Sequence, residues 1–147
     1  MKNILALVVA TCFLLLTGFQ SRAEESAEKK EPVQKQEDYT EKWGIKIVSL
    51  RPTASDRMLD LRYRVVNSDK AAGIMKKGQK AYVVQESTGY ILSVPVTKLG
   101  PMRSTAVKPK ENRVYVVLFG NGNGIVKKGD FVTLVIGDLK VEHVPVQ

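Results

Sequence analysis

The last third of the chain constrains the fold most strongly, because it contains three apolar runs separated by turn residues. The first two runs, 114–119 and 131–136, are rich in β-branched and aromatic residues, and the third, 139–144, mixes apolar and charged residues. Runs of this composition are typical of β-strands. The Gly137-Asp138 pair between the last two runs is a hairpin signal. Three strands this apolar need a second layer over their buried face, and the preceding residues must supply it.

The clearest of the earlier strand candidates is 58–66. Its odd positions from 59 to 65 are apolar, and its even positions from 60 to 64 are charged. This period of two predicts a strand with one buried face and one wet face, as in an antiparallel sheet. The other candidates are 44–50, 80–86 and 90–96. Pro95 lacks an N–H group, which places the last of these at a sheet edge or ends it there.

Two segments interrupt the strands. Residues 67–79 have helical character, with Ser68 or Asp69 as a cap, and residues 97–112 form a long loop that we expect to cross between two sheets. Together with these segments, the pattern predicts an all-β fold. We expect an antiparallel immunoglobulin-like sandwich of about seven strands with one short helical segment. A small closed barrel is the alternative.

The N-terminus has the pattern of a signal peptide. A short positive region precedes the apolar segment 4–19, and 21–23 (Ser-Arg-Ala) places small residues at the cleavage positions before Glu24. We expect residues 1–23 to be removed and the protein to be periplasmic or secreted. The alternative is a retained N-terminal membrane anchor, although the apolar segment is shorter than the ~20 residues of a spanning helix.

Charge divides the remaining chain into two parts. Residues 24–42 hold seven acids and four lysines with almost no apolar residues, so we expect a disordered acidic linker. Residues 43–147 hold 17 basic and eight acidic side chains, a net charge of +9, and form the predicted β-sandwich domain. This asymmetry affects partners and solubility rather than the fold.

Cys12 is the only cysteine, and it lies within the apolar segment. A chain without its signal peptide therefore has no disulfide, no catalytic thiol and no thiolate metal site, although the export compartment would permit disulfides. Its stability must come from the core. The 105 residues of the domain are enough for a core of sufficient size.

The strand-rich segments 59–66, 82–96 and 114–144 together resemble those of small exported bacterial proteins with an immunoglobulin-like β-sandwich. The resemblance covers roughly residues 44–146. It implies export and a sandwich architecture. Because the shared motifs are strands and turns, it carries over no functional residue.

Catalytic signatures are weak. His143 is the only histidine, and Ser93 or Ser104 would have to join it in a triad without any G-x-S-x-G motif. The glycine- and asparagine-rich tract 120–124 leads toward another strand rather than a helix, so we interpret it as a turn and not as a phosphate cradle. We therefore expect a non-enzymatic protein without a cofactor, and a hydrolase with no recognisable site is a second alternative.

Thioether chemistry gives the first alternative function. Methionine binds Cu(I), and an exported domain with Met58, Met75, Met102 and His143 is compatible with periplasmic copper handling. These residues are not spaced as a cluster, so packing explains them more simply. The sequence therefore predicts no metal ligands.

Basic residues are the remaining signal. Six of them, on one face of a predicted strand, just after it, or in loops and strand ends, are candidates for binding an anion or a partner: Arg62, Arg64, Lys76, Lys77, Lys127 and Lys128. Anionic lipid, acidic polysaccharide or an acidic envelope protein are the partners such residues would attract. Export and the lack of a recognition motif disfavour nucleic acid. We predict a cell-envelope binding or interaction module that uses a basic face or an edge strand.

Overall fold

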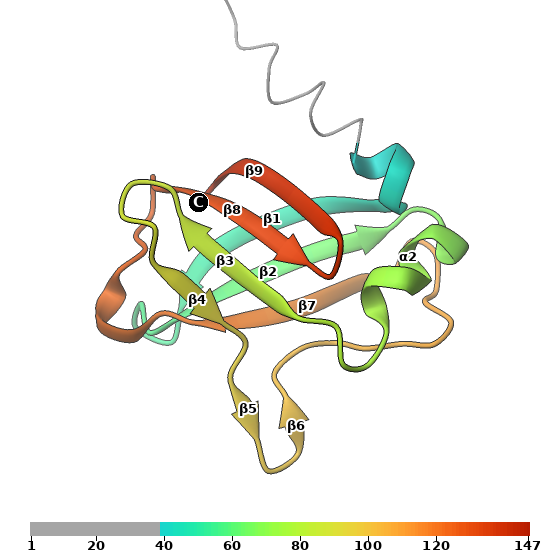
Figure 1. The fold of residues 1–147 in the computed structure, drawn as a ribbon, viewed down its shortest axis with the longest axis horizontal. Coiled ribbons are helices and arrows are strands. Elements are labelled where there is room, and N and C mark those ends of the chain that lie inside the picture. Colours follow the sequence, from blue (N-terminus) through green and yellow to red (C-terminus); the bar gives the residue numbers. More distant parts are fainter. Residues whose placement is uncertain (1–38) are drawn as a thin grey trace, which may run out of the picture.

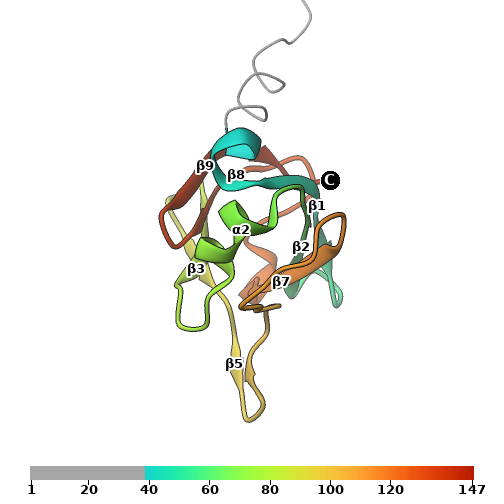
Figure 2. The ribbon, with the colours of Figure 1, turned by 90° about the vertical axis from the view of Figure 1, so that its right-hand side faces the viewer.

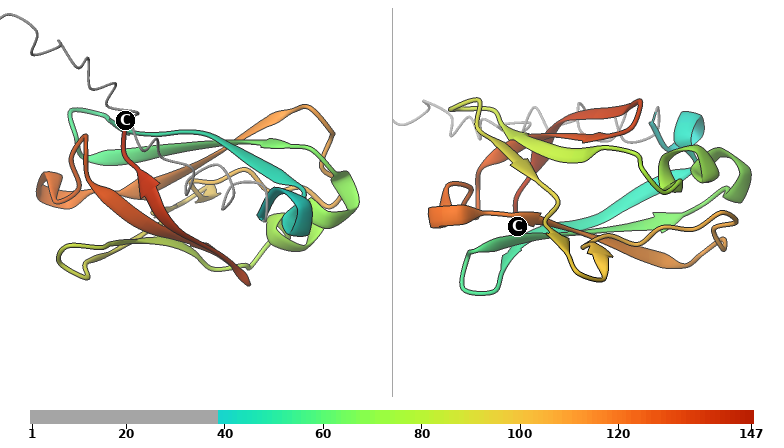
Figure 3. Two further views of the ribbon diagram at one scale, coloured as in Figure 1. Left: turned by 90° about the horizontal axis from the view of Figure 1, so that it is seen from above. Right: turned by 60° about the horizontal axis from the view of Figure 1, so that its bottom comes forward.

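The computed structural model describes residues 39–147, which form two antiparallel sheets packed face to face (Figure 1; Figure 3, right). One sheet has three strands in the order β1-β2-β7, and the other has four in the order β4-β3-β8-β9. The strands of the first are β1 (Ile45–Thr53), β2 (Met58–Val65) and β7 (Val114–Gly120), and those of the second are β3 (Ala81–Gln85), β4 (Ile91–Ser93), β8 (Phe131–Ile136) and β9 (Leu139–Pro145). The predicted all-β class is confirmed.

The alternation predicted for β2 is confirmed at every position from Leu59 to Val65 except Asp60, which is buried. Leu59, Leu61, Tyr63 and Val65 are fully buried, whereas Arg62 and Arg64 are exposed on the outer face of the three-stranded sheet. The inward side chains of β2 meet those of β3 and β8 in one hydrophobic cluster that both sheets share. Because a strand alternates between core and solvent, Arg62 and Arg64 are left available for contacts at the surface.

The described part of the chain includes residues 39–42, which were predicted to belong to the linker. Residues 39–43 form a helical turn, and Tyr39 and Trp43 both pack against the core from it. Residues four apart lie on the same side of a helical turn, which explains why both rings reach the core. The predicted signal peptide and most of the predicted linker lie outside the described residues.

The predicted helical segment is α2 (Ser68–Met75), and its cap differs from the prediction. Asn67, rather than Ser68 or Asp69, is the N-cap residue, and its side-chain oxygen accepts a hydrogen bond from the N–H of Lys70. Ala71, Ile74 and Met75 are buried. The helix thereby closes one end of the space between the two sheets (Figure 1).

The segment 97–112 crosses between the sheets as predicted, but it is more than a loop. It contains most of a two-stranded hairpin of β5 (Val96–Thr97) and β6 (Gly100–Pro101). Residues 102–104 then run along the free side of β7, where the N–H of Ser104 donates to Val116 O and the N–H of Leu118 donates to Met102 O. This segment covers one edge of the three-stranded sheet.

Within residues 39–147, no helix is both long and apolar enough to cross a bilayer.

Candidate anion-binding site

One end of the sandwich carries an open hollow of about 800 Å³ between the β1–β2 turn and the β7–β8 connection. Nine residues line it: Pro52, Ser55, Asp56, Arg57, Gly122, Asn123, Gly124, Lys127 and Lys128. The lining contains three cations and one carboxylate, so that its net charge is positive. We call this feature the end hollow.

Unusual backbone conformations shape the wall of the end hollow. Ala54, Ser55 and Asp56 are consecutive residues with φ of 53°, 54° and 62°, and Asn123 has φ of 61°. Left-handed conformations cost non-glycine residues roughly 1–2 kcal/mol each. Strain of this kind persists only where surrounding contacts impose it, and it concentrates at functional sites.

Asn121 joins the two loops that form this wall. Its side chain is fully buried, and its Nδ2 donates to Asp56 O at 2.7 Å and to Val126 O at 2.8 Å. Its Oδ1 accepts from the Val126 N–H at 2.9 Å. One amide group therefore joins the β1–β2 turn to both ends of the opposite loop, across 65 positions of sequence.

A second buried amide holds the segment that carries Lys127 and Lys128. The Nε2 of Gln85 donates to Ile125 O at 3.1 Å and to an Asp130 carboxylate oxygen at 2.8 Å. The same carboxylate oxygen accepts from the N–H of Lys127 at 2.9 Å. The backbone beneath both lysines is thus fixed, which lowers the ordering cost of binding a ligand.

The cations of the end hollow are not neutralised by the domain. Within residues 39–147, the side chains of Arg57, Lys127 and Lys128 have no ion pair with a carboxylate, although Asp56 lies in the same lining. An arginine fork and two ammonium groups suit phosphate or carboxylate oxygens. The chemistry that the end hollow offers is therefore recognition of an anion.

A second basic surface lies on the outer face of the three-stranded sheet. The register places Lys46 directly opposite Arg64, and Arg51 opposite Asp60. Arg62 reaches the carboxylate of Asp60 at 3.0 Å. Like charges directly opposite each other destabilise a sheet, so the opposed Lys46 and Arg64 concentrate positive charge here at a cost in stability. We call Lys46, Arg51, Arg62 and Arg64 the sheet face.

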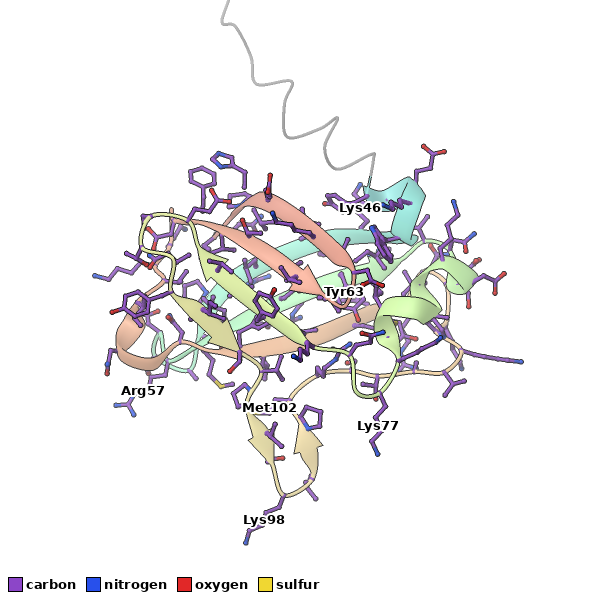
Figure 4. The ribbon with its side chains drawn as sticks, viewed as in Figure 1. Lys46, Arg57, Tyr63, Lys77, Lys98 and Met102 are labelled. Carbon is purple, nitrogen blue, oxygen red and sulfur yellow. The ribbon has the colours of Figure 1, made fainter. Side chains whose placement is uncertain are left out.

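The six basic residues predicted from the sequence thus fall in three places. Arg62 and Arg64 lie on the sheet face, and Lys127 and Lys128 line the end hollow. Lys76 and Lys77 follow the last residue of α2, and Lys77 lies apart from both Arg57 and Lys46 (Figure 4). They do not form one patch. No pattern in the sequence indicated Arg57, which joins the two lysines only because loops distant in the chain meet there.

His143 makes a stacking contact and hydrogen bonds with residues next to it in and beside the four-stranded sheet. The residue lies at a bulge of β9 with φ of 60°, its ring stacks on Phe131 at 4.0 Å, and its Nδ1 lies 3.1 Å from Glu86 Oε2. Partial burial raises the pKa of Glu86, but its hydrogen bonds with His143 and Thr133 outweigh this effect and lower the pKa.

The two serines considered for a triad lie elsewhere. Ser93 is on β4, at the opposite edge of the four-stranded sheet from β9, roughly 14 Å away at ordinary strand spacing. Ser104 lies beside β7 in the other sheet.

The methionines considered for copper are also dispersed. Met75 is fully buried at the end of α2, Met58 begins β2, and Met102 lies at the base of the β5–β6 hairpin. Within residues 39–147, no group of three or more histidine, cysteine, aspartate or glutamate side chains is placed to hold a metal ion. The structure does not bring Met102 and His143 to a common element or sheet edge.

Comparison of the chain with protein-family models, with curated proteins and with solved structures finds no match.

Proposed function

We propose that this chain is an exported, non-enzymatic binding module of the cell envelope, and that the end hollow receives an anionic group of its partner. The observation that carries the proposal is the grouping of Arg57, Lys127 and Lys128 on loops that two buried amides hold in place. Such a site needs little reorganisation on binding. The proposal that the chain is exported rests on the signal-peptide pattern of residues 1–23.

We further propose that the sandwich is immunoglobulin-like. Three strands facing four, with antiparallel pairing throughout, support this assignment. In that architecture the connecting loops cluster at the two ends, and binding sites are built from them. The end hollow is a loop-built site of this kind.

The ligand class follows from the lining. Polymers that carry phosphate or carboxylate groups outside the cytoplasm would meet three cations and flexible hydrogen-bond donors in a hollow wider than a single anion. The sheet face is the second candidate surface, favoured by its opposed Lys46 and Arg64. Its flat, extended shape would suit contact along a strand-like or linear polyanion.

Matched variants separate the two surfaces. One variant replaces Arg57, Lys127 and Lys128 with glutamine, and the other replaces Lys46, Arg62 and Arg64 with glutamine, so that both lose three positive charges. Binding of the chain from Glu24 onward is measured on immobilised polyphosphate and on polygalacturonate, with neutral dextran as the control, at low and high salt.

The proposal expects the first variant to bind at least tenfold more weakly and the second to change less, with binding lost at high salt because exposed charge attraction is screened. The polymer that the chain binds more tightly, polyphosphate or polygalacturonate, identifies phosphate or carboxylate as the preferred group. A loss confined to the second variant assigns binding to the sheet face, and equal effects of both variants would refute a localised site.

A further inference from the structure

The β5–β6 hairpin stands out from the body of the domain. It projects away from both sheets in perpendicular views (Figures 1 and 2). Leu99 at its turn is fully exposed, and Val96 on its first strand is 78% exposed. Two apolar side chains are thus presented at the most protruding point that these views show.

The turn of the hairpin is fixed by its own hydrogen bonds. Val96 pairs with Pro101 and Thr97 pairs with Gly100. The Thr97 hydroxyl donates to Gly100 O at 2.9 Å and accepts from the Leu99 N–H at 3.2 Å. Leu99 is therefore held outward by a closed turn.

The base of the hairpin is equally firm. The N–H of Met102 donates to Pro95 O at 2.9 Å, which closes the base, and the N–H of Leu118 bonds Met102 O from β7. The guanidinium of Arg103 donates to Gln79 O and to Ile74 O, both at 2.9 Å. The hairpin is a stiff projection joined to β7 and to the end of α2.

Positive charge accompanies the apolar tip. Lys98 is next to Leu99 in the turn, and Lys77 extends from the end of α2 on the same side of the molecule, whereas Lys46 lies on the opposite side (Figure 4). Val107, which is 89% exposed, lies near the end of α2, because the N–H of Ala106 bonds Met75 O. Apolar and cationic groups therefore share this side.

We propose that the hairpin docks the domain on an anionic lipid surface, with Val96 and Leu99 entering the interface and Lys98 and Lys77 contacting headgroup phosphates. Segments that lie in a membrane interface combine apolar side chains with basic ones. The apolar side chains are stabilised by burial in the interface, and the basic ones are attracted by anionic headgroups. The flexible stem of Lys98 allows its ammonium group to reach the headgroups while Leu99 is inserted. The inference is independent of the end hollow.

The test measures insertion of the hairpin rather than binding of the whole chain to vesicles. The apolar segment 4–19 of the full chain would bind vesicles by itself. A nitrobenzoxadiazole label is attached at Val96→Cys in the full chain carrying Cys12→Ser. The matched control carries the same label at Lys46→Cys. Both are mixed with phosphatidylglycerol–phosphatidylcholine vesicles whose acyl chains bear a nitroxide quencher, and with phosphatidylcholine vesicles bearing the same quencher.

The proposal expects quenching at position 96 with the anionic vesicles and little at position 46. Leu99→Asn is expected to lower the ratio of inserted to free hairpin about tenfold, since a buried leucine contributes at least that factor. Lys77→Glu with Lys98→Glu is expected to lower it by a similar factor. Absence of quenching at position 96, or equal quenching at both positions, overturns the proposal. A cross-link from position 96 to an envelope protein without quenching also overturns it and assigns the hairpin to a protein partner.

Discussion

Replacement of Asn121 by alanine should loosen the end hollow and destabilise the domain together. The substitution removes three hydrogen bonds that the buried amide makes with Asp56 O and with the backbone of Val126. Each unmade bond of a buried backbone group costs about 1 kcal/mol or more. We therefore expect the free energy of unfolding to fall by about 3 kcal/mol, a large part of the roughly 5–15 kcal/mol available to a domain.

Urea denaturation followed by circular dichroism measures this change. For an m value of about 1.5 kcal/mol/M, the midpoint should fall by about 2 M. Asn123→Gly is the matched control, because Asn123 is exposed in the same loop and its φ of 61° suits glycine. We expect its midpoint to change little.

Binding gives the second readout for Asn121→Ala. At a temperature where the variant remains folded, its affinity for the preferred polyanion should fall although no cation has been removed. A loss of stability below about 1 kcal/mol would show that water satisfies the freed backbone groups. Unchanged affinity in a destabilised variant would show that the end hollow does not depend on the buried amide.

Three further substitutions test the fold. Burial raises the pKa of Tyr63 to about 12, whereas an unfolded tyrosine ionises near 10, so the free energy of unfolding should fall by about 2–3 kcal/mol between pH 10 and 12 as the unfolded state loses its proton first. Tyr63→Phe should reduce this loss in urea titrations at alkaline pH. The variant should be as stable as the original at pH 7, because the hydroxyl has no hydrogen-bond partner within residues 39–147. Gly44→Ala should cost roughly 2 kcal/mol or more, since φ is +64° and the added Cβ would lie 2.6 Å from Asn67 O. The control Gly89→Ala, at φ +74°, meets no atom within 4 Å and should cost about 1 kcal/mol. Equal urea midpoints for the two variants would contradict the steric account. Arg103→Met should cost about 2 kcal/mol by removing two charge-assisted hydrogen bonds, and an unchanged thermal midpoint would refute this account.

Local sequence patterns were sufficient to predict the main strands. The alternation of β2 predicted its buried and exposed faces, because a pleated strand repeats every two residues. Pro95 correctly indicated an edge, since β4 ends at Ser93 and is the outer strand of its sheet. These features depend only on neighbours in the chain.

Features that depend on distant contacts were not predictable in the same way. Arg57 joins Lys127 and Lys128 because Asn121 bonds the opposite loop, and no single segment contains that information. Asp60 was expected on the wet face, yet it is buried there because Arg62 and neighbouring strands cover it. The β5–β6 hairpin was missed because two-residue strands are too short to show a period.

The last residues of the described chain link the two sheets. The N–H of Val146 bonds Asp130 O near β8, and the N–H of Gln147 bonds Leu50 O on β1. Within the three-stranded sheet, Arg64 on β2 pairs with Val114, 50 positions later. Contacts of such long sequence separation form slowly. The hydrogen bonds that join the two sheets at this end therefore form late in folding, after the local pairing of β8 with β9, and the sandwich is closed last by its final residues.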